Sequence, residues 1–128
     1  MNRHAGTVWK LIAARAFDNA GHELPSPLGP QPLGVAIFEA ERLIATAADG
    51  RPSLPPDTPG RAFACYTGRY TFDGTTLTTS VDAASSPDML ADQIRRIRFE
   101  SETRMVVEPV TRLFDHGAGL ELVWQRMG

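Results

Sequence analysis

The chain has 128 residues, of which 22% are charged, and a formal net charge of -2. A chain of this length has room for one core, so we expect residues 1–128 to form a single domain. Its 13 basic residues are spread along the sequence without the dense basic patch of nucleic-acid-binding or membrane-attracted proteins, and we expect neither partner.

Cysteine and histidine are too sparse to predict a metal or another cofactor. The single cysteine, Cys65, excludes an intrachain disulfide and a thiol pair for a metal. His4, His22 and His116 lie near the N-terminus or in expected loops, where histidines are usually solvated, and their spacing matches no zinc site. The N-terminal stretch MNRHAGTVWKLIAARAF has no apolar run as long as a signal or membrane span, so we expect a cytoplasmic protein.

Hydrophobic and polar residues alternate with a period of two in eight short blocks, which is typical of an all-β chain. The expected strands are 6–17, 31–38, 42–48, 62–72, 75–83, 93–101, 103–110 and 119–127. Short connections at 39–41, at Asp73-Gly74 and at Glu102 indicate hairpins between neighbours. In SSPDMLADQ, Ser86 as N-cap and Pro87 at the first helical position predict at most one short helical turn.

Two longer stretches, HELPSPLGPQP and DGRPSLPPDTPG, are expected to leave the sheet because proline cannot donate ladder hydrogen bonds. The second, 49–60, suits either a lid or an oligomer contact, and a homodimer is one possibility. Eight hairpin-linked strands form either a sandwich or a barrel. We favour the eight-stranded antiparallel up-and-down β-barrel, which leaves no exposed edge and has room for side chains or one small ligand.

The hairpin around Asp73-Gly74 indicates which strand faces are buried. A two-residue turn at 73–74 pairs Tyr70 with Leu77 and Tyr66 with Val81 on one face. The other face carries an arginine and several threonines, which suit a solvated surface, so the aromatic face is expected inside. The inward set is Tyr66, Gly68, Tyr70, Phe72, Thr75, Leu77, Thr79 and Val81.

The same parity places Gln93, Arg95, Ile97 and Phe99 inside the barrel. A buried guanidinium must be paired or hydrogen-bonded, because an isolated buried charge costs several kcal/mol. Its partner is a protein group or water that only fixes the packing, or the carboxylate, enolate or carbonyl oxygen of a ligand. The expected ligand-binding residues are Tyr66, Tyr70, Thr79, Gln93, Arg95 and Phe99.

The two ends of the chain are expected to meet where the barrel closes. Alternation puts Trp9 on the inner face of the first strand and Arg126 on a shared face with Trp124 in the last. A cation–π contact between Trp9 and Arg126, of roughly 0.5–2 kcal/mol, would close one end of the barrel. This pair is expected to have a structural role.

Several segments together resemble the small bacterial lipocalin-like domain family. They are GTVW (6–9), PLGPQPLGVAIF (27–38), YTGRY (66–70), Gln93-x-Arg95 and LVWQR (122–126), and they cover nearly the whole chain. The resemblance implies a β-barrel with a central pocket for a small, mostly apolar molecule. Family members often carry histidines where Thr79 and Ser80 stand here, so proton chemistry based on them is not expected.

Three functions fit these observations. The first is binding of a small, mostly hydrophobic ligand that bears a carboxylate or carbonyl group. The second is an isomerase, cyclase or dehydratase in which Arg95 acts with Tyr66 or Tyr70, although no inward carboxylate or histidine is an evident base. The third is a structural or partner-binding barrel with a filled interior, and the volume of the cavity discriminates it from the other two.

Overall fold

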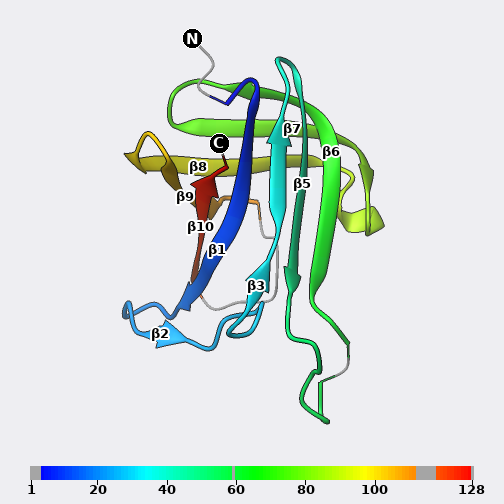
Figure 1. Ribbon diagram of the computed structural model, residues 1–128, viewed down its shortest axis with the longest axis vertical. Coiled ribbons are helices and arrows are strands. Elements are labelled where there is room, and N and C mark those ends of the chain that lie inside the picture. The colour runs from blue at the N-terminus through cyan, green and yellow to red at the C-terminus, as the bar shows by residue number, and fades with distance from the viewer. Residues whose placement is uncertain (1–3, 59, 112–117, 128) are drawn as a thin grey trace.

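The computed structural model describes residues 4–58, 60–111 and 118–127 and shows a closed β-barrel (Figure 1). Each long strand pairs antiparallel with the next long strand, and β10 pairs with β1 to close the sheet. The barrel strands are β1 (Thr7–Phe17), β4 (Val35–Phe38), β5 (Arg42–Asp49), β6 (Phe63–Phe72), β7 (Thr76–Ala84), β8 (Asp92–Ser101), β9 (Arg104–Pro109) and β10 (Gly119–Arg126). The predicted eight-stranded antiparallel up-and-down barrel is confirmed.

Two very short strands lie at one end of the barrel. β2 (Glu23–Leu24) pairs with the end of β1, and β3 (Pro32–Leu33) pairs with the end of β5. The predicted strand 31–38 is thus divided at Gly34 into β3 and β4. A Cβ atom on Gly34 would lie 2.3 Å from the carbonyl oxygen of Thr46, so the chains approach too closely there for any larger residue.

One 3-10 turn, η1 (Pro87–Met89), is the helical element within the described residues, and it lies where the sequence predicts one helical turn. Ser86 precedes it in an extended conformation, but its hydroxyl contacts the carboxylate of Asp88 and makes no cap to the backbone. Ser86 is therefore the N-cap residue as predicted, without a side-chain hydrogen bond to the backbone. No helix in the described part of the chain is long and apolar enough to cross a membrane.

The loop of the β6–β7 hairpin lies one residue later than predicted. The backbone N–H of Asp73 donates to the carbonyl oxygen of Thr76, so Gly74 and Thr75 form the loop. The Asp73 carboxylate accepts hydrogen bonds from the backbone N–H groups of Thr75, at 2.9 Å, and Thr76, at 2.7 Å. This local acceptor stabilises the later loop, and Thr75 is exposed in it rather than inside the barrel.

The later loop shifts the register of this hairpin by two residues. Tyr70 lies opposite Thr79 rather than Leu77, and beyond an irregularity Tyr66 lies opposite Ala84. Because side chains alternate with a period of two, this shift leaves each side chain on its predicted face. Tyr66, Tyr70, Leu77 and Thr79 are all buried, so the predicted inner face is confirmed even though the predicted pairs are wrong.

The two ends of the barrel differ in their connections. One end carries the tight turns 39–41, 73–75 and 102–103, and we call it the short-loop end. The other, the long-loop end, carries the connections 18–31, 50–62 and 85–91; β2, β3 and the loop after β5 lie together at the bottom of Figure 1. Access to the interior is therefore expected from the long-loop end.

Aromatic side chains fill the short-loop end. His4 is fully buried, with its ring centroid 4.4 Å from that of Phe38 and 4.6 Å from that of Phe72. Trp9 donates from Nε1 to the Thr7 hydroxyl at 2.7 Å, and that hydroxyl donates to the carbonyl oxygen of His4. The expectation that His4 is solvated is wrong, because this N-terminal residue folds into the end of the barrel.

Candidate functional site

The barrel encloses a small hollow of about 40 Å³. Its described lining residues are Ala36, Phe38, Leu43, Ala45, Thr46, Ala47, Ala64, Tyr66, Leu77, Arg95, Met105, Val107, Leu122 and Trp124. A water molecule occupies about 30 Å³, whereas pockets for drug-sized ligands measure about 300–1,000 Å³. The hollow thus has room for the small polar head group of a ligand, and a larger molecule requires a movement of the barrel walls.

Arg95 is the charged residue among the described lining residues, and only 2% of its surface is exposed. Nη1 donates to the carbonyl oxygens of Ile94, at 3.1 Å, and Thr111, at 3.2 Å, while Nη2 donates to Oε1 of Gln93 at 3.1 Å. Its Cζ lies 5.7 Å from the ring centroid of Tyr66. No carboxylate of the described residues lies within 4.0 Å of the guanidinium, so neutral dipoles hold this buried charge.

Gln93 and Thr79 lie beside Arg95 on the inner face, directly opposite one another on β8 and β7. Gln93 is 1% exposed, and its Nε2 is 3.3 Å from the carbonyl oxygen of Met89 and 3.4 Å from that of Ala91. Thr79 is fully buried, and its hydroxyl has no hydrogen-bond partner among the described residues. These three neighbouring side chains therefore form a polar patch whose hydrogen-bonding groups are not all paired.

The other predicted site residues do not all reach the hollow. Tyr66 lines it beside Arg95, whereas Tyr70 donates its hydroxyl to the carbonyl oxygen of Glu39 in a turn of the short-loop end. Phe99 is half-buried at that end, with its ring centroid 5.7 Å from that of His4. The structure thus brings Tyr66 and Arg95 together at the hollow, with Gln93 behind them.

Trp9 and Arg126 are direct partners in the pairing of β1 with β10. Trp9 is 1% exposed while Arg126 is exposed, and together with Phe99 and Glu102 they line a depression of about 280 Å³ outside the short-loop end. Opposite residues of an antiparallel pair share a face, so the two lie at the same rim of the barrel. The cation–π contact between them stays a prediction.

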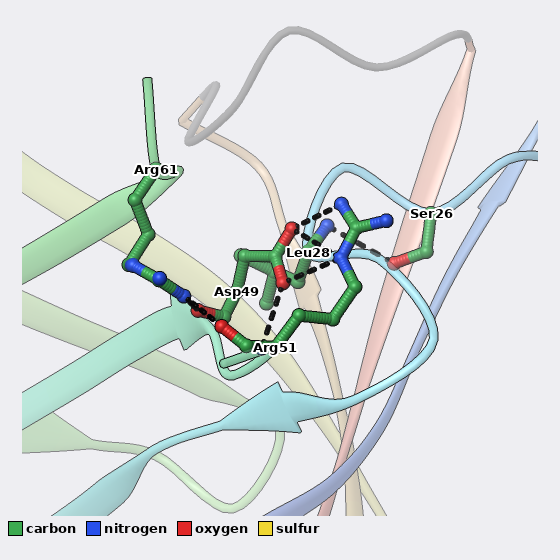
Figure 2. Close-up of polar contacts among 5 residues, drawn as sticks. All are labelled: Ser26, Leu28, Asp49, Arg51 and Arg61. Atoms are coloured by element: carbon green, nitrogen blue, oxygen red, sulfur yellow. Dashed lines mark hydrogen bonds and ion pairs between the residues drawn. The ribbon is translucent and has the colours of Figure 1, made fainter. Parts of the chain in front are cut away.

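Leu28 belongs to a loop rather than to a strand, yet it is fully buried in the core at the long-loop end. Figure 2 shows the polar contacts around this loop. The backbone N–H of Leu28 donates to the hydroxyl of Ser26 at 3.1 Å. Gly29 has a φ of 68°, and a Cβ atom there would lie 2.8 Å from Nε of Arg51. The Arg51 side chain therefore lies against the backbone that carries Leu28.

Asp49 holds Arg51 in this position. Nε of Arg51 lies 3.0 Å from Oδ1 of Asp49, and Nη2 lies 2.5 Å from Oδ2. Arg61, from the far end of the 50–62 connection, donates from Nη1 to the carbonyl oxygens of Asp49 and Arg51, both at 2.6 Å. These three residues, the clamp, tie the two ends of the 50–62 connection together, and Arg51 brings this connection against Gly29 of the other Pro-rich connection.

The clamp has electrostatic consequences for Asp49. The hydrogen bond from Arg51 is the main cause that lowers the pKa of Asp49 below its ordinary value of 3.8, against the opposing effect of burial. Asp49 is only 4% exposed and continues the inward parity of β5, so it is a buried carboxylate that the sequence analysis did not name. The sequence signal was the alternation Leu43, Ala45, Ala47, Asp49, followed two residues later by an arginine.

A wider groove of about 600 Å³ lies outside the barrel between β1 and the 23–32 segment. Ile12, Ala13 and Arg15 form one wall, and Leu24 and Pro30 lie on the other. The segment pairs with β1 at β2, where Leu24 lies opposite Ala16, and the groove lies beside this pairing. Arg51 of the clamp lines the same groove as Gly29, so the clamp is well placed to restrain the loop that carries Leu28.

Metal-ligating side chains do not gather within the described residues. No group of three or more His, Cys, Asp or Glu side chains there lies close enough to hold a metal ion. His116, one of the three histidines expected to be solvated, lies outside the described residues.

The chain matches no protein-family model and no curated protein. Among solved structures it is similar to a redesigned β-barrel, b11L5F_LGL, with 14% sequence identity, coverage of 98% of this chain and 93% of that chain, and a TM-score of 0.47. The assignment of the barrel therefore rests on the strand pairing of this chain itself, and the lipocalin-like family stays a prediction.

Proposed function

We propose that the barrel binds a small, mostly hydrophobic molecule, as the lipocalin-like resemblance implies, and that Arg95 holds a carboxylate or carbonyl group of this molecule. One observation carries the proposal: a guanidinium that is 2% exposed lines an otherwise apolar hollow without a carboxylate partner among the described residues. Buried charges are normally paired, and an oxygen atom of a bound ligand would give the Arg95 guanidinium a further hydrogen-bond acceptor.

The ligand enters from the long-loop end in this proposal. A hollow of about 40 Å³ accepts the head group of a ligand, so the apolar remainder needs further space, which displacement of the fully buried Leu28 would supply. Leu28 belongs to a connection outside the barrel strands, and its displacement breaks no hydrogen bond of the barrel ladder. Opening of the clamp is then the step that admits a ligand.

Titration tests this proposal directly. Purified protein is titrated with butanoate, octanoate, benzoate and the corresponding methyl ketones, with calorimetry and the fluorescence of Trp124 as readouts. Arg95→Met is the test variant, and Arg96→Met, an exposed arginine on the opposite face of β8, is the matched control. Binding by the wild type and Arg96→Met, but not by Arg95→Met, is expected; no binding of any probe to the wild type rejects the proposal.

The small volume of the hollow favours a second candidate, a barrel whose filled interior is structural and whose outer surface contacts a partner. This candidate predicts that no probe binds and that loss of Arg95 destabilises the fold. The enzyme alternative has less support: the described lining contains no Asp, Glu or His, and the paired Asp49 is a weak base because its pKa is lowered.

A further inference from the structure

The unused donors of Arg95 define the chemistry of the group it receives. A guanidinium has five N–H donors. Nη1 uses two, on Ile94 and Thr111, and Nη2 uses one, on Gln93. Nε–H and one N–H of Nη2 are left without a partner among the described residues. Nε and Nη2 share one edge of the guanidinium, and arginine grips planar carboxylates in a bidentate manner along such an edge.

The positive charge of Arg95 also favours a carboxylate over a neutral carbonyl group as its partner. Arg95 contributes a positive charge to the hollow, and the described lining residues contribute no negative one. A neutral carbonyl accepts a hydrogen bond but leaves that charge uncompensated, whereas a carboxylate accepts two hydrogen bonds and neutralises it. The hydroxyl of the fully buried Thr79, which also lacks a partner in the described residues, shows that the neighbouring inner face has further unmet hydrogen-bonding capacity.

We infer that the ligand is a monocarboxylate with an apolar remainder, held side-on by Nε and Nη2 of Arg95. This inference rests on the proposed function and narrows it. Besides Arg95, the described lining offers mainly apolar side chains and the Tyr66 ring, and the hydroxyl of the lining residue Thr46 is bonded to the backbone of Val35. A second carboxylate, or the ammonium group of an amino acid, would meet no opposite charge there, so dicarboxylates and amino acids are rejected.

A set of eight-carbon probes tests which polar head group the barrel prefers. Octanoate, octanamide, octanol and octanedioate share one chain length, and each is titrated into the wild type, Arg95→Lys, Arg95→Met and the control Arg96→Met. We expect octanoate to bind the wild type at least about tenfold more tightly than the other three probes. Arg95→Lys should lose about tenfold for octanoate because it keeps the charge but not the two-donor edge, and Arg95→Met should bind octanoate no better than octanamide.

Each outcome distinguishes this inference from the proposed function. Equal binding of octanoate and octanamide, both dependent on Arg95, overturns the carboxylate assignment and leaves the ligand-binding barrel intact. Preference for octanedioate over octanoate overturns the monocarboxylate assignment. If none of the four probes nor the ketones binds the wild type, the proposed function itself fails. Circular dichroism of each variant shows whether the barrel is still folded.

Discussion

Arg95 and Gln93 lie two residues apart on the inner face of β8, and Nη2 of Arg95 donates a 3.1 Å hydrogen bond to Oε1 of Gln93. Gln93 is in turn anchored near the backbone carbonyls of Met89 and Ala91, beside the 3-10 turn. The connection at 85–91 therefore positions the buried guanidinium through one intermediate side chain. Whether Arg95 serves binding or only packing is decided by what its removal does to stability.

Arg95→Met is expected to keep the stability of the wild type or to raise it by about 1–2 kcal/mol, because an apolar side chain of similar length avoids burial of a charge. The carbonyl oxygen of Ile94 keeps its hydrogen bonds from the backbone N–H groups of Val110 and Thr111. Urea unfolding of the variant and of the control Arg96→Met measures the difference. A loss of more than about 2 kcal/mol would show that Arg95 is a structural element of the core.

Arg51→Ala is expected to release the loop that carries Leu28. The substitution removes the side chain that lies against Gly29 and that joins Asp49 to this loop. Amide hydrogen exchange of residues 26–31 should become faster while that of the barrel strands stays unchanged. Arg42→Ala is the control, since it removes an exposed ion pair with Asp82 elsewhere on the barrel. Unchanged exchange at 26–31 would show that the clamp does not restrain Leu28.

Asp49→Asn is expected to change how stability depends on pH. The pKa of Asp49 is lowered in the folded state, chiefly by the hydrogen bond from Arg51, so the folded state binds fewer protons than the unfolded state. This contribution is present above the ordinary value of 3.8 and is lost as pH falls through the lower folded-state pKa. Urea midpoints of wild type and variant should differ most above about pH 5 and converge toward about pH 2. Parallel pH profiles would contradict the assignment.

Gly68→Ala is expected to destabilise the barrel by about 1–3 kcal/mol. A Cβ atom at Gly68 would lie 2.1 Å from the carbonyl oxygen of Ser80 on β7, next to the irregularity in this strand pair. Gly60→Ala is the control, because a Cβ there meets no atom within 4 Å and Gly60 has no positive φ. Thermal unfolding of both variants compares them, and equal midpoints would mean that the strands separate at little cost.

Trp9→Phe is expected to cost about 1–3 kcal/mol, through the lost hydrogen bond to Thr7 and the space left by the smaller ring. Trp9 is 1% exposed and its ring lies 6.3 Å from that of His4, between centroids. Guanidinium unfolding followed by the fluorescence of the remaining Trp124 measures the loss. A variant as stable as the wild type would show that the aromatic cluster at the short-loop end is not needed to close the barrel.

The sequence determined the strands, their order and the inward direction of Tyr66 and Arg95, because alternation along a strand is local and survives a register error of two residues. It did not determine the hairpin register, since the carboxylate of Asp73 selected a loop one residue later. The burial of His4, the contact of Arg51 with Gly29 and the size of the hollow were decided by the tertiary structure alone. Each depends on segments that are distant in the chain and meet only when the barrel closes, and no local periodicity encodes such contacts.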